Sequence, residues 1–130
     1  MPRDVAQFFE QYRDAFNRLD GGAVADLYCV PSGIVSDVGL TTWDSRDPIA
    51  KNMGALCDLY RANGFKQAAF ETSHFFAQGN EFVVADLAWT IEREGGADPW
   101  CFRTTYNLRR MVEGWRVILC TAYEEQRLNT

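Results

Sequence analysis

The second half of this sequence constrains the fold most, because residues 65–124 form one long run of strand-like segments. Three turn signals interrupt the run: Gly79-Asn80, the glycine-containing segment 94–99, and Glu113-Gly114. The residues between these turns predict four antiparallel strands over 65–77, 82–93, 100–111 and 115–124. An antiparallel sheet of this kind usually has one apolar face that other elements must cover.

The first half of the sequence predicts helices that could cover this apolar face. Apolar residues at helical spacing predict a helix from Val5 to Leu19, with Asp4 and Gln7 as a variant capping box. Gly21-Gly22 is expected to stop this helix, because glycine readily adopts the conformation that ends helices.

Three more elements are expected before the long run of strands. The sequence predicts a short helix over 23–28, a strand over 32–40, and a third helix that begins at Asp47-Pro48 and ends at Gly64. The predicted order is therefore α-α-β-α-β-β-β-β. This order describes an α+β domain with helices on one face of a mainly antiparallel sheet.

Composition limits the possible partners and the number of domains. A chain of 130 residues with 47% hydrophobic content suffices for one core, so we expect a single domain over residues 1–130. The net charge is −5 and the arginines are dispersed, which argues against nucleic acid or an anionic membrane as partner. No apolar run approaches the roughly 20 residues that span a bilayer, and no secretory signal precedes the first helix. We therefore expect a soluble, cytoplasmic protein.

The cysteines show no spacing typical of a metal site. Cys29, Cys57, Cys101 and Cys120 lie far apart, without Cys-x-x-Cys or Cys/His pairs. We expect reduced thiols that fill the core or an interface, and we expect no metal. Short signatures of nucleotide, zinc-protease and hydrolase sites are also missing from the sequence.

Strand alternation assigns side chains to two faces of the sheet. A two-residue turn at Gly79-Asn80 would pair His74 with Ala85 and Phe70 with Trp89. A turn at Glu113-Gly114 would likewise pair Tyr106 with Thr121 and Thr104 with Tyr123. The helix-facing face would then carry these site candidates: His74, Trp89, Trp100, Thr104, Tyr106, Thr121 and Tyr123. The outer face would carry Cys120 together with Asp86 and Arg103, which could oppose each other across adjacent strands. A slip of one residue would exchange the two faces.

The helix-facing face has more aromatic bulk than three modest helices readily cover. One interpretation is a concave apolar pocket with a few hydrogen-bonding groups. The alternative is a packed core whose hydroxyl groups bond to each other.

The element order, "WDSRDPIAKNM" before the third helix and the closing strand "GWRVILCTAYEE" resemble the nuclear transport factor 2-like superfamily. This superfamily includes SnoaL-like polyketide cyclases, ketosteroid isomerases and scytalone dehydratases. "DLYCVPSGIVSD" and "LYRANGF" look like an uncharacterised branch. The resemblance implies a cone-shaped fold with a curved sheet, a cavity between sheet and helices, and a homodimer through the outer sheet face.

The same resemblance suggests candidate catalytic residues. Dehydratases and some cyclases of the group carry protons on histidine and aspartate, so His74 is the candidate acid or base. Tyr106 or Tyr123 would be its hydrogen-bonding partner, and Asp37 would be its orienting carboxylate. Asp44 is the other residue that could supply a carboxylate at the cavity mouth. The alternative for His74 is a buried ring satisfied by a hydroxyl group.

Six further residues are candidates for ligand binding: Trp89, Trp100, Thr104, Thr121, Tyr123 and Tyr28. For the tryptophans, simple core packing is the alternative.

Three functions remain open on these grounds. The first is a domain that binds a small apolar or aromatic molecule. The second is a cyclase, dehydratase or isomerase that uses general acid and base catalysis without a cofactor. The third is a homodimeric interaction module whose cavity is filled by its own side chains.

Overall fold

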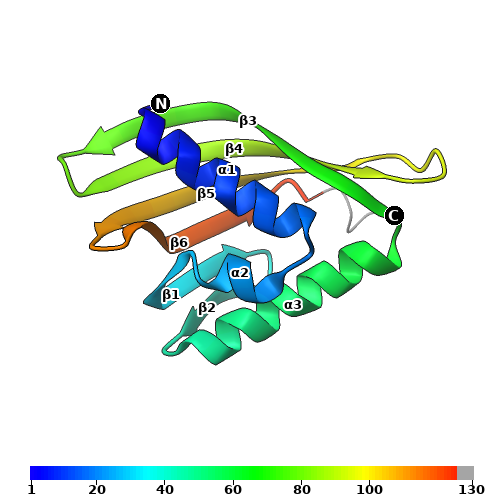
Figure 1. The fold of residues 1–130 in the computed structure, drawn as a ribbon, viewed down its shortest axis with the longest axis horizontal. Coiled ribbons are helices and arrows are strands. Elements are labelled where there is room, and N and C mark those ends of the chain that lie inside the picture. Colours follow the sequence, from blue (N-terminus) through cyan, green and yellow to red (C-terminus); the bar gives the residue numbers. More distant parts are fainter. Residues whose placement is uncertain (126–130) are drawn as a thin grey trace.

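Three helices cover one face of a six-stranded sheet (Figure 1). The structure is a computed structural model and describes residues 1–125. Its elements in chain order are α1 (Arg3–Asn17), α2 (Gly21–Ala25), β1 (Tyr28–Ser36), β2 (Gly39–Trp43), α3 (Arg46–Ala62), β3 (Phe65–Gln78), β4 (Phe82–Arg93), β5 (Trp100–Met111) and β6 (Gly114–Tyr123). The fold class is α+β, as the sequence predicts.

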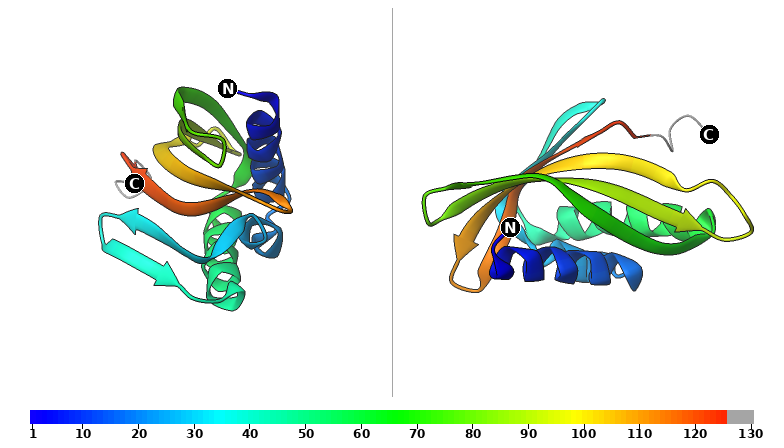
Figure 2. Two further views of the ribbon diagram at one scale, coloured as in Figure 1. Left: turned by 90° about the vertical axis from the view of Figure 1, so that its left-hand side faces the viewer. Right: turned by 90° about the horizontal axis from the view of Figure 1, so that it is seen from above.

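The strands lie side by side in the order β2-β1-β6-β5-β4-β3. Strand β1 runs parallel to β6, whereas the other neighbouring pairs are antiparallel. The sheet is curved, and all three helices lie on the same side of it (Figure 2). This side is the helix-facing face, and no helix within residues 1–125 covers the opposite, outer face.

The predicted meander is confirmed. Strands β4 and β5 have the predicted bounds, and β3 and β6 differ from the prediction by one residue at their ends. The strand predicted over 32–40 is instead a hairpin of β1 and β2 that turns at Asp37 and Val38. The sequence pattern missed β2 because its first four residues are exposed, so no apolar alternation marks them.

Helix α1 begins earlier than predicted, and Asp4 does not cap it. Pro2 occupies the N-cap position without a side-chain hydrogen bond. The Asp4 carboxylate accepts hydrogen bonds from the backbone N–H of Val5 (2.9 Å) and from Trp115 Nε1 (3.0 Å). Asp4 therefore ties the start of α1 to strand β6.

Helices α2 and α3 come into backbone contact at Gly21. A Cβ atom at Gly21 would lie 2.5 Å from the backbone nitrogen of Gly54 and 2.9 Å from the carbonyl carbon of Met53. Asp20 caps α2 by accepting a hydrogen bond from the backbone N–H of Ala23 (3.0 Å). The prediction that Gly21-Gly22 stops the first helix is therefore wrong, because these residues begin α2.

Candidate functional site

A pocket of about 80 Å³ lies between the helix-facing face and the helices α1 and α3. Seven of its lining residues, from α1, β1, α3, β4 and β5, are aromatic: Tyr12, Phe16, Tyr28, Tyr60, Trp89, Phe102 and Tyr106. Several of these rings also contact each other, for example Tyr12 and Tyr106 with centroids 5.3 Å apart. An apolar hollow with a few polar groups is typical of small-molecule sites.

Hydroxyl groups on the pocket wall form a buried hydrogen-bond network. The Tyr12 and Tyr28 hydroxyl oxygens lie 2.7 Å apart, and the Tyr28 hydroxyl lies 3.5 Å from the Cys120 sulfur. Trp89 Nε1 donates a hydrogen bond to the Tyr106 hydroxyl (3.1 Å). Helix α1 and strands β1, β4, β5 and β6 thus meet in one polar cluster inside an aromatic wall.

Burial keeps these groups protonated. Loss of solvent raises the pKa of Tyr12, Tyr28 and Tyr106 well above the ordinary tyrosine value. Burial also raises the pKa of Cys120 to about 11, although the hydrogen bond with Tyr28 acts in the opposite direction. At neutral pH the pocket therefore holds neutral phenols and a thiol, and Cys120 is not a nucleophilic thiolate.

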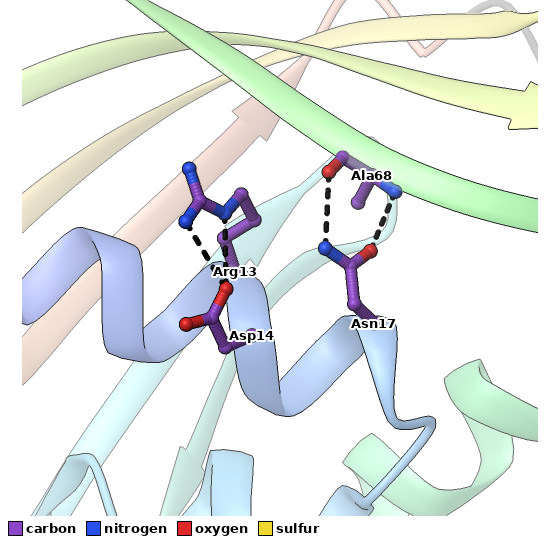
Figure 3. A network of polar contacts seen from close by, with 4 residues as sticks. All are labelled: Arg13, Asp14, Asn17 and Ala68. Carbon is purple, nitrogen blue, oxygen red and sulfur yellow. Dashed lines mark hydrogen bonds and ion pairs between the residues drawn. The ribbon is translucent and has the colours of Figure 1, made fainter.

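Asn17 fixes the wall where α1 ends against β3. Its side-chain oxygen accepts a hydrogen bond from the Ala68 backbone N–H (2.7 Å), and its side-chain nitrogen donates to the Ala68 carbonyl (3.4 Å; Figure 3). The nearby pair of Arg13 and Asp14 is exposed and lies on α1 alone. Because Ala68 lines the pocket, the Asn17 contact holds both sides of this wall in register.

Glu125 is the one acidic residue on the described pocket wall. It is half-buried and follows the end of β6, and Asn52 on α3 is an exposed lining residue. These two residues therefore mark the side of the pocket that faces solvent. Sequence reasoning missed Glu125 because Glu124 has a left-handed backbone (φ 54), which breaks the alternation of the strand before it.

Metal ligands do not converge in the described part of the chain. No group of three or more His, Cys, Asp or Glu side chains in residues 1–125 could hold a metal ion. The four cysteines are free thiols. None of the helices in this range is long and apolar enough to cross a bilayer.

Four of the predicted site residues come together at the pocket: Tyr28, Trp89, Thr104 and Tyr106. Trp100 does not line the pocket, although it is buried on the same face of the sheet. The Arg93 guanidinium lies 4.5 Å from the Trp100 ring centroid, and the Tyr60 ring lies 6.2 Å from it. Trp100 therefore packs behind the pocket wall.

The prediction that His74 faces the helices is wrong. His74 lies opposite Asp86 on the outer face and is exposed. The error comes from the hairpin after β3, which has a three-residue loop instead of the predicted two-residue turn. A bulge at Ser73 then shifts the pairing back by one residue. Phe70 still pairs with Trp89 as predicted, because the two shifts cancel beyond the bulge.

Thr121 and Tyr123 also lie on the outer face, contrary to prediction. Thr121 pairs with Thr105, and Tyr123 pairs with Arg103. A register shift in the β5–β6 pair, between Asn107 and Leu108, reverses the alternation of the rest of β6. The same shift turns Cys120, predicted to face outward, toward the pocket.

Asp37 and Asp44 do not reach the pocket. Asp37 is exposed at the turn between β1 and β2, and Asp44 is exposed between β2 and α3. Neither belongs to the pocket wall. The predicted set of His74, Tyr106 and Asp37 is therefore separated, and only Tyr106 lies at the pocket.

A second polar cluster lies on the outer face around Asp86. Its carboxylate accepts hydrogen bonds from Arg103 Nη2 (2.7 Å), Thr105 Oγ1 (2.9 Å) and the Tyr123 hydroxyl (2.6 Å). Burial alone would raise the pKa of Asp86, but these hydrogen bonds outweigh it and lower the pKa below the ordinary value. The pairing of Asp86 with Arg103 that the sequence suggests is confirmed.

The fold and the sequence together identify the family. Residues 3–125 match the family described as NTF2-like protein (DUF6841). The chain belongs to this family. The superfamily suggested by "GWRVILCTAYEE" is therefore confirmed. None of the curated proteins matches this NTF2-like domain.

Solved structures similar to this NTF2-like domain share its architecture. A cystatin-like domain of unknown function from Nostoc punctiforme has a TM-score of 0.73 and 16% identity, covering 91% of this chain and 73% of its own. A ketosteroid isomerase-like protein from Erwinia carotovora has a TM-score of 0.68 and 17% identity, covering 91% of each chain. A protein from Xanthomonas campestris, described as a calcium/calmodulin dependent protein kinase II association domain, has a TM-score of 0.70 and 18% identity, covering 92% and 84%. At these identities the likeness shows the fold alone.

Proposed function

We propose that this NTF2-like domain, a single domain over residues 1–130, binds a small molecule in the pocket between α1, α3 and the sheet. The observation that carries the proposal is the polar network of Tyr12, Tyr28 and Cys120 inside a largely apolar wall. Such a wall offers apolar contact area, and its hydroxyl groups offer directional hydrogen bonds.

The volume of the pocket limits the ligand. A dry apolar cavity of about 150 Å³ holds benzene, whereas this pocket has about 80 Å³. The bound part of the ligand is therefore smaller than an aromatic ring, unless the ligand extends through the open side near Asn52 and Glu125. A fused ring system, such as a steroid, does not fit inside.

Filling the pocket tests the proposal. Ala122 lines the pocket on β6, so Ala122→Leu places extra carbon atoms in the hollow. We expect this variant to lose roughly tenfold or more in affinity for any small molecule that shifts the amide resonances of pocket residues. The measurement is a titration of small molecules followed by NMR.

The matched control is Ala88→Leu on the outer face, where Ala88 pairs with Arg103. The control should bind like the native protein. Equal binding by the two variants would place the ligand elsewhere and would contradict the proposed site.

A second candidate function is a cofactor-free enzyme, a cyclase, dehydratase or isomerase. The observation that favours it is the carboxylate of Glu125 on the same wall as the Tyr12 and Tyr28 hydroxyl groups. A carboxylate can remove a proton next to a carbonyl, and a phenol can stabilise the resulting oxyanion. Deuterium incorporation next to the carbonyl of small ketones in D₂O would support it, and no incorporation above the buffer rate would count against it.

We also propose a homodimer through the outer face. Apolar side chains remain accessible on this face, including Phe76 and Phe82, which are 54% and 39% exposed. The Asp86–Arg103 pair on the same face carries no net charge, so it would not repel its own copy. The proposal also places the domain in the cytoplasm, where its free thiols would stay reduced.

Sedimentation equilibrium tests the dimer. Val84 lies on the outer face between Asn107 and Phe76, so Val84→Arg would bring two like charges into a symmetric interface. We expect the native protein to sediment as a dimer and this variant to sediment as a monomer. Val38→Arg, at a turn residue that is 91% exposed, should remain dimeric. A native protein that is monomeric at every concentration would contradict the dimer.

A further inference from the structure

We infer that two copies of this domain pack their outer faces together so that Glu71 of each copy contacts Arg109 of the other. This inference rests on the proposed homodimer and names the contacts that orient it. It combines three observations: the charges at the two ends of the outer face, the surface between those ends, and the symmetry of a pair of identical chains.

Two acidic side chains lie at one end of the outer face. Glu71 on β3 is paired with Ala88 on β4, and further along β4 Glu92 is paired with Gln67. Because side chains alternate along a strand, Glu92 points to the same face as Ala88. Lys66 lies in the adjacent bulge of β3, but neither carboxylate forms an ion pair within residues 1–125. Both carboxylates can therefore pair with a cation from outside the chain.

Two arginines lie at the other end of the outer face. Arg109 on β5 is paired with Phe82 on β4 and with Arg116 on β6. Like charges directly opposite each other destabilise a sheet. The Arg109 guanidinium lies 6.0 Å from the Phe82 ring centroid, and Arg116 Nη1 donates a hydrogen bond to the Trp115 carbonyl (2.7 Å). Neither arginine forms an ion pair with another described residue, so an acidic partner would relieve their repulsion.

The surface between the two ends offers apolar contact without an unpaired carboxylate. On β4 the outward residues between the two ends are Val84 and Asp86. Asp86 is already paired with Arg103, and Phe76 lies opposite Val84 with 54% of its surface exposed. A second copy could therefore bury the centre of the face while its charges meet those at the two ends.

Two-fold symmetry decides which ends meet. An axis parallel to the strands would bring the basic ends of the two copies together. An axis that crosses the strands exchanges the two ends, so each Arg109 meets a Glu71. Strands β3 and β5 flank β4, so the midpoint of this pair falls on β4 between Val84 and Asp86. Phe76 lies beside that point and would pack against its own copy.

Charge reversal at the two positions tests the inference. Glu71→Arg would place two positive charges against each other in both symmetric contacts, and Arg109→Glu would place two negative ones. We expect each variant alone to raise the dissociation constant of the dimer roughly tenfold or more in sedimentation equilibrium. High salt should reduce this loss, because it screens exposed charges. The control is Glu10→Arg, an equal change of charge at an exposed position of α1, which should dimerise like the native protein.

A mixture of the two variants shows whether the contact joins two chains. In a mixed dimer of Glu71→Arg with Arg109→Glu, both contacts again join opposite charges. The mixture should therefore dimerise with roughly the native dissociation constant, although each variant alone is weaker. The double variant Glu71→Arg/Arg109→Glu keeps the native net charge and should also dimerise like the native protein.

The outcomes separate the inference from the proposed homodimer. If the native protein is dimeric and either single variant dimerises equally tightly, the contact is overturned and the homodimer stands. Failure of the mixture to restore dimers overturns the contact in the same way. If the native protein is monomeric at every concentration, both the contact and the homodimer are overturned.

Discussion

Replacing Gly21 with alanine is expected to lower the free energy of unfolding by about 2–3 kcal/mol. The new methyl group would lie 2.5 Å from the backbone nitrogen of Gly54 and 2.7 Å from its Cα. Backbone atoms cannot rotate away as a side chain can, so α2 and α3 must separate and lose packing. Chemical denaturation followed by circular dichroism measures the change.

Gly54, the other glycine of this contact, provides the control. A Cβ atom at Gly54 would meet no atom within 4 Å, so Gly54→Ala adds no clash. Because alanine favours helix over glycine, Gly54→Ala should stabilise α3 by about 0.5–1 kcal/mol. Destabilisation of similar size by both variants would mean that the close approach of α2 and α3 is not the cause.

Replacing Asp86 with asparagine is expected to destabilise the domain by about 2–3 kcal/mol at neutral pH. Breaking a fully buried ion pair costs about 3–5 kcal/mol, and the loss here is smaller because the Arg103 side chain is 32% exposed. The Asp86 side chain is 7% exposed and accepts three hydrogen bonds. Asparagine cannot supply the charge that Arg103 and the two hydroxyl groups contact.

The stabilisation that Asp86 provides should decrease as the pH falls. The folded-state pKa of Asp86 lies below its ordinary value of about 3.9. Its stabilisation is therefore complete above that ordinary pKa and is lost as the pH falls through the folded-state pKa. Denaturation of the native protein and Asp86→Asn between neutral and strongly acidic pH should show their stabilities converging in acid.

Asp58→Asn is the control for this measurement. Asp58 forms an exposed pair with Arg61, with side chains that are 76% and 58% exposed. Exposed pairs of this kind contribute about 0–1 kcal/mol. A loss for Asp86→Asn no larger than for Asp58→Asn would contradict the importance of the outer-face cluster.

Local patterns in the sequence were enough for most of the fold. Turn residues such as Gly79-Asn80 and the apolar alternation between them gave the four long strands, because both signals depend only on neighbouring residues. Strand β2 was missed because it is an exposed edge strand with little apolar content. Strands β4 and β5 have the predicted faces, since no bulge interrupts their pairing.

The candidate site was harder to predict than the fold. Trp89 and Tyr106 lie on strands with regular pairing, and both line the pocket as the alternation suggested. His74 lies next to a hairpin loop with one extra residue, and Tyr123 lies beyond a register shift in β6, and each irregularity moves the side chain to the other face. The residue types at Ser73 and around Leu108 do not indicate a change of strand register.

The sequence by itself determined the order of the three helices and the four long strands, the α+β class and the aromatic character of the helix-facing face. The tertiary structure alone decided that Glu125 belongs to the pocket, that His74 does not, and that Gly21 is where two helices meet. The physical reason is the range of the interactions. Strand and helix signals come from residues close in the chain, whereas bulges and helix crossings depend on packing between segments far apart in it.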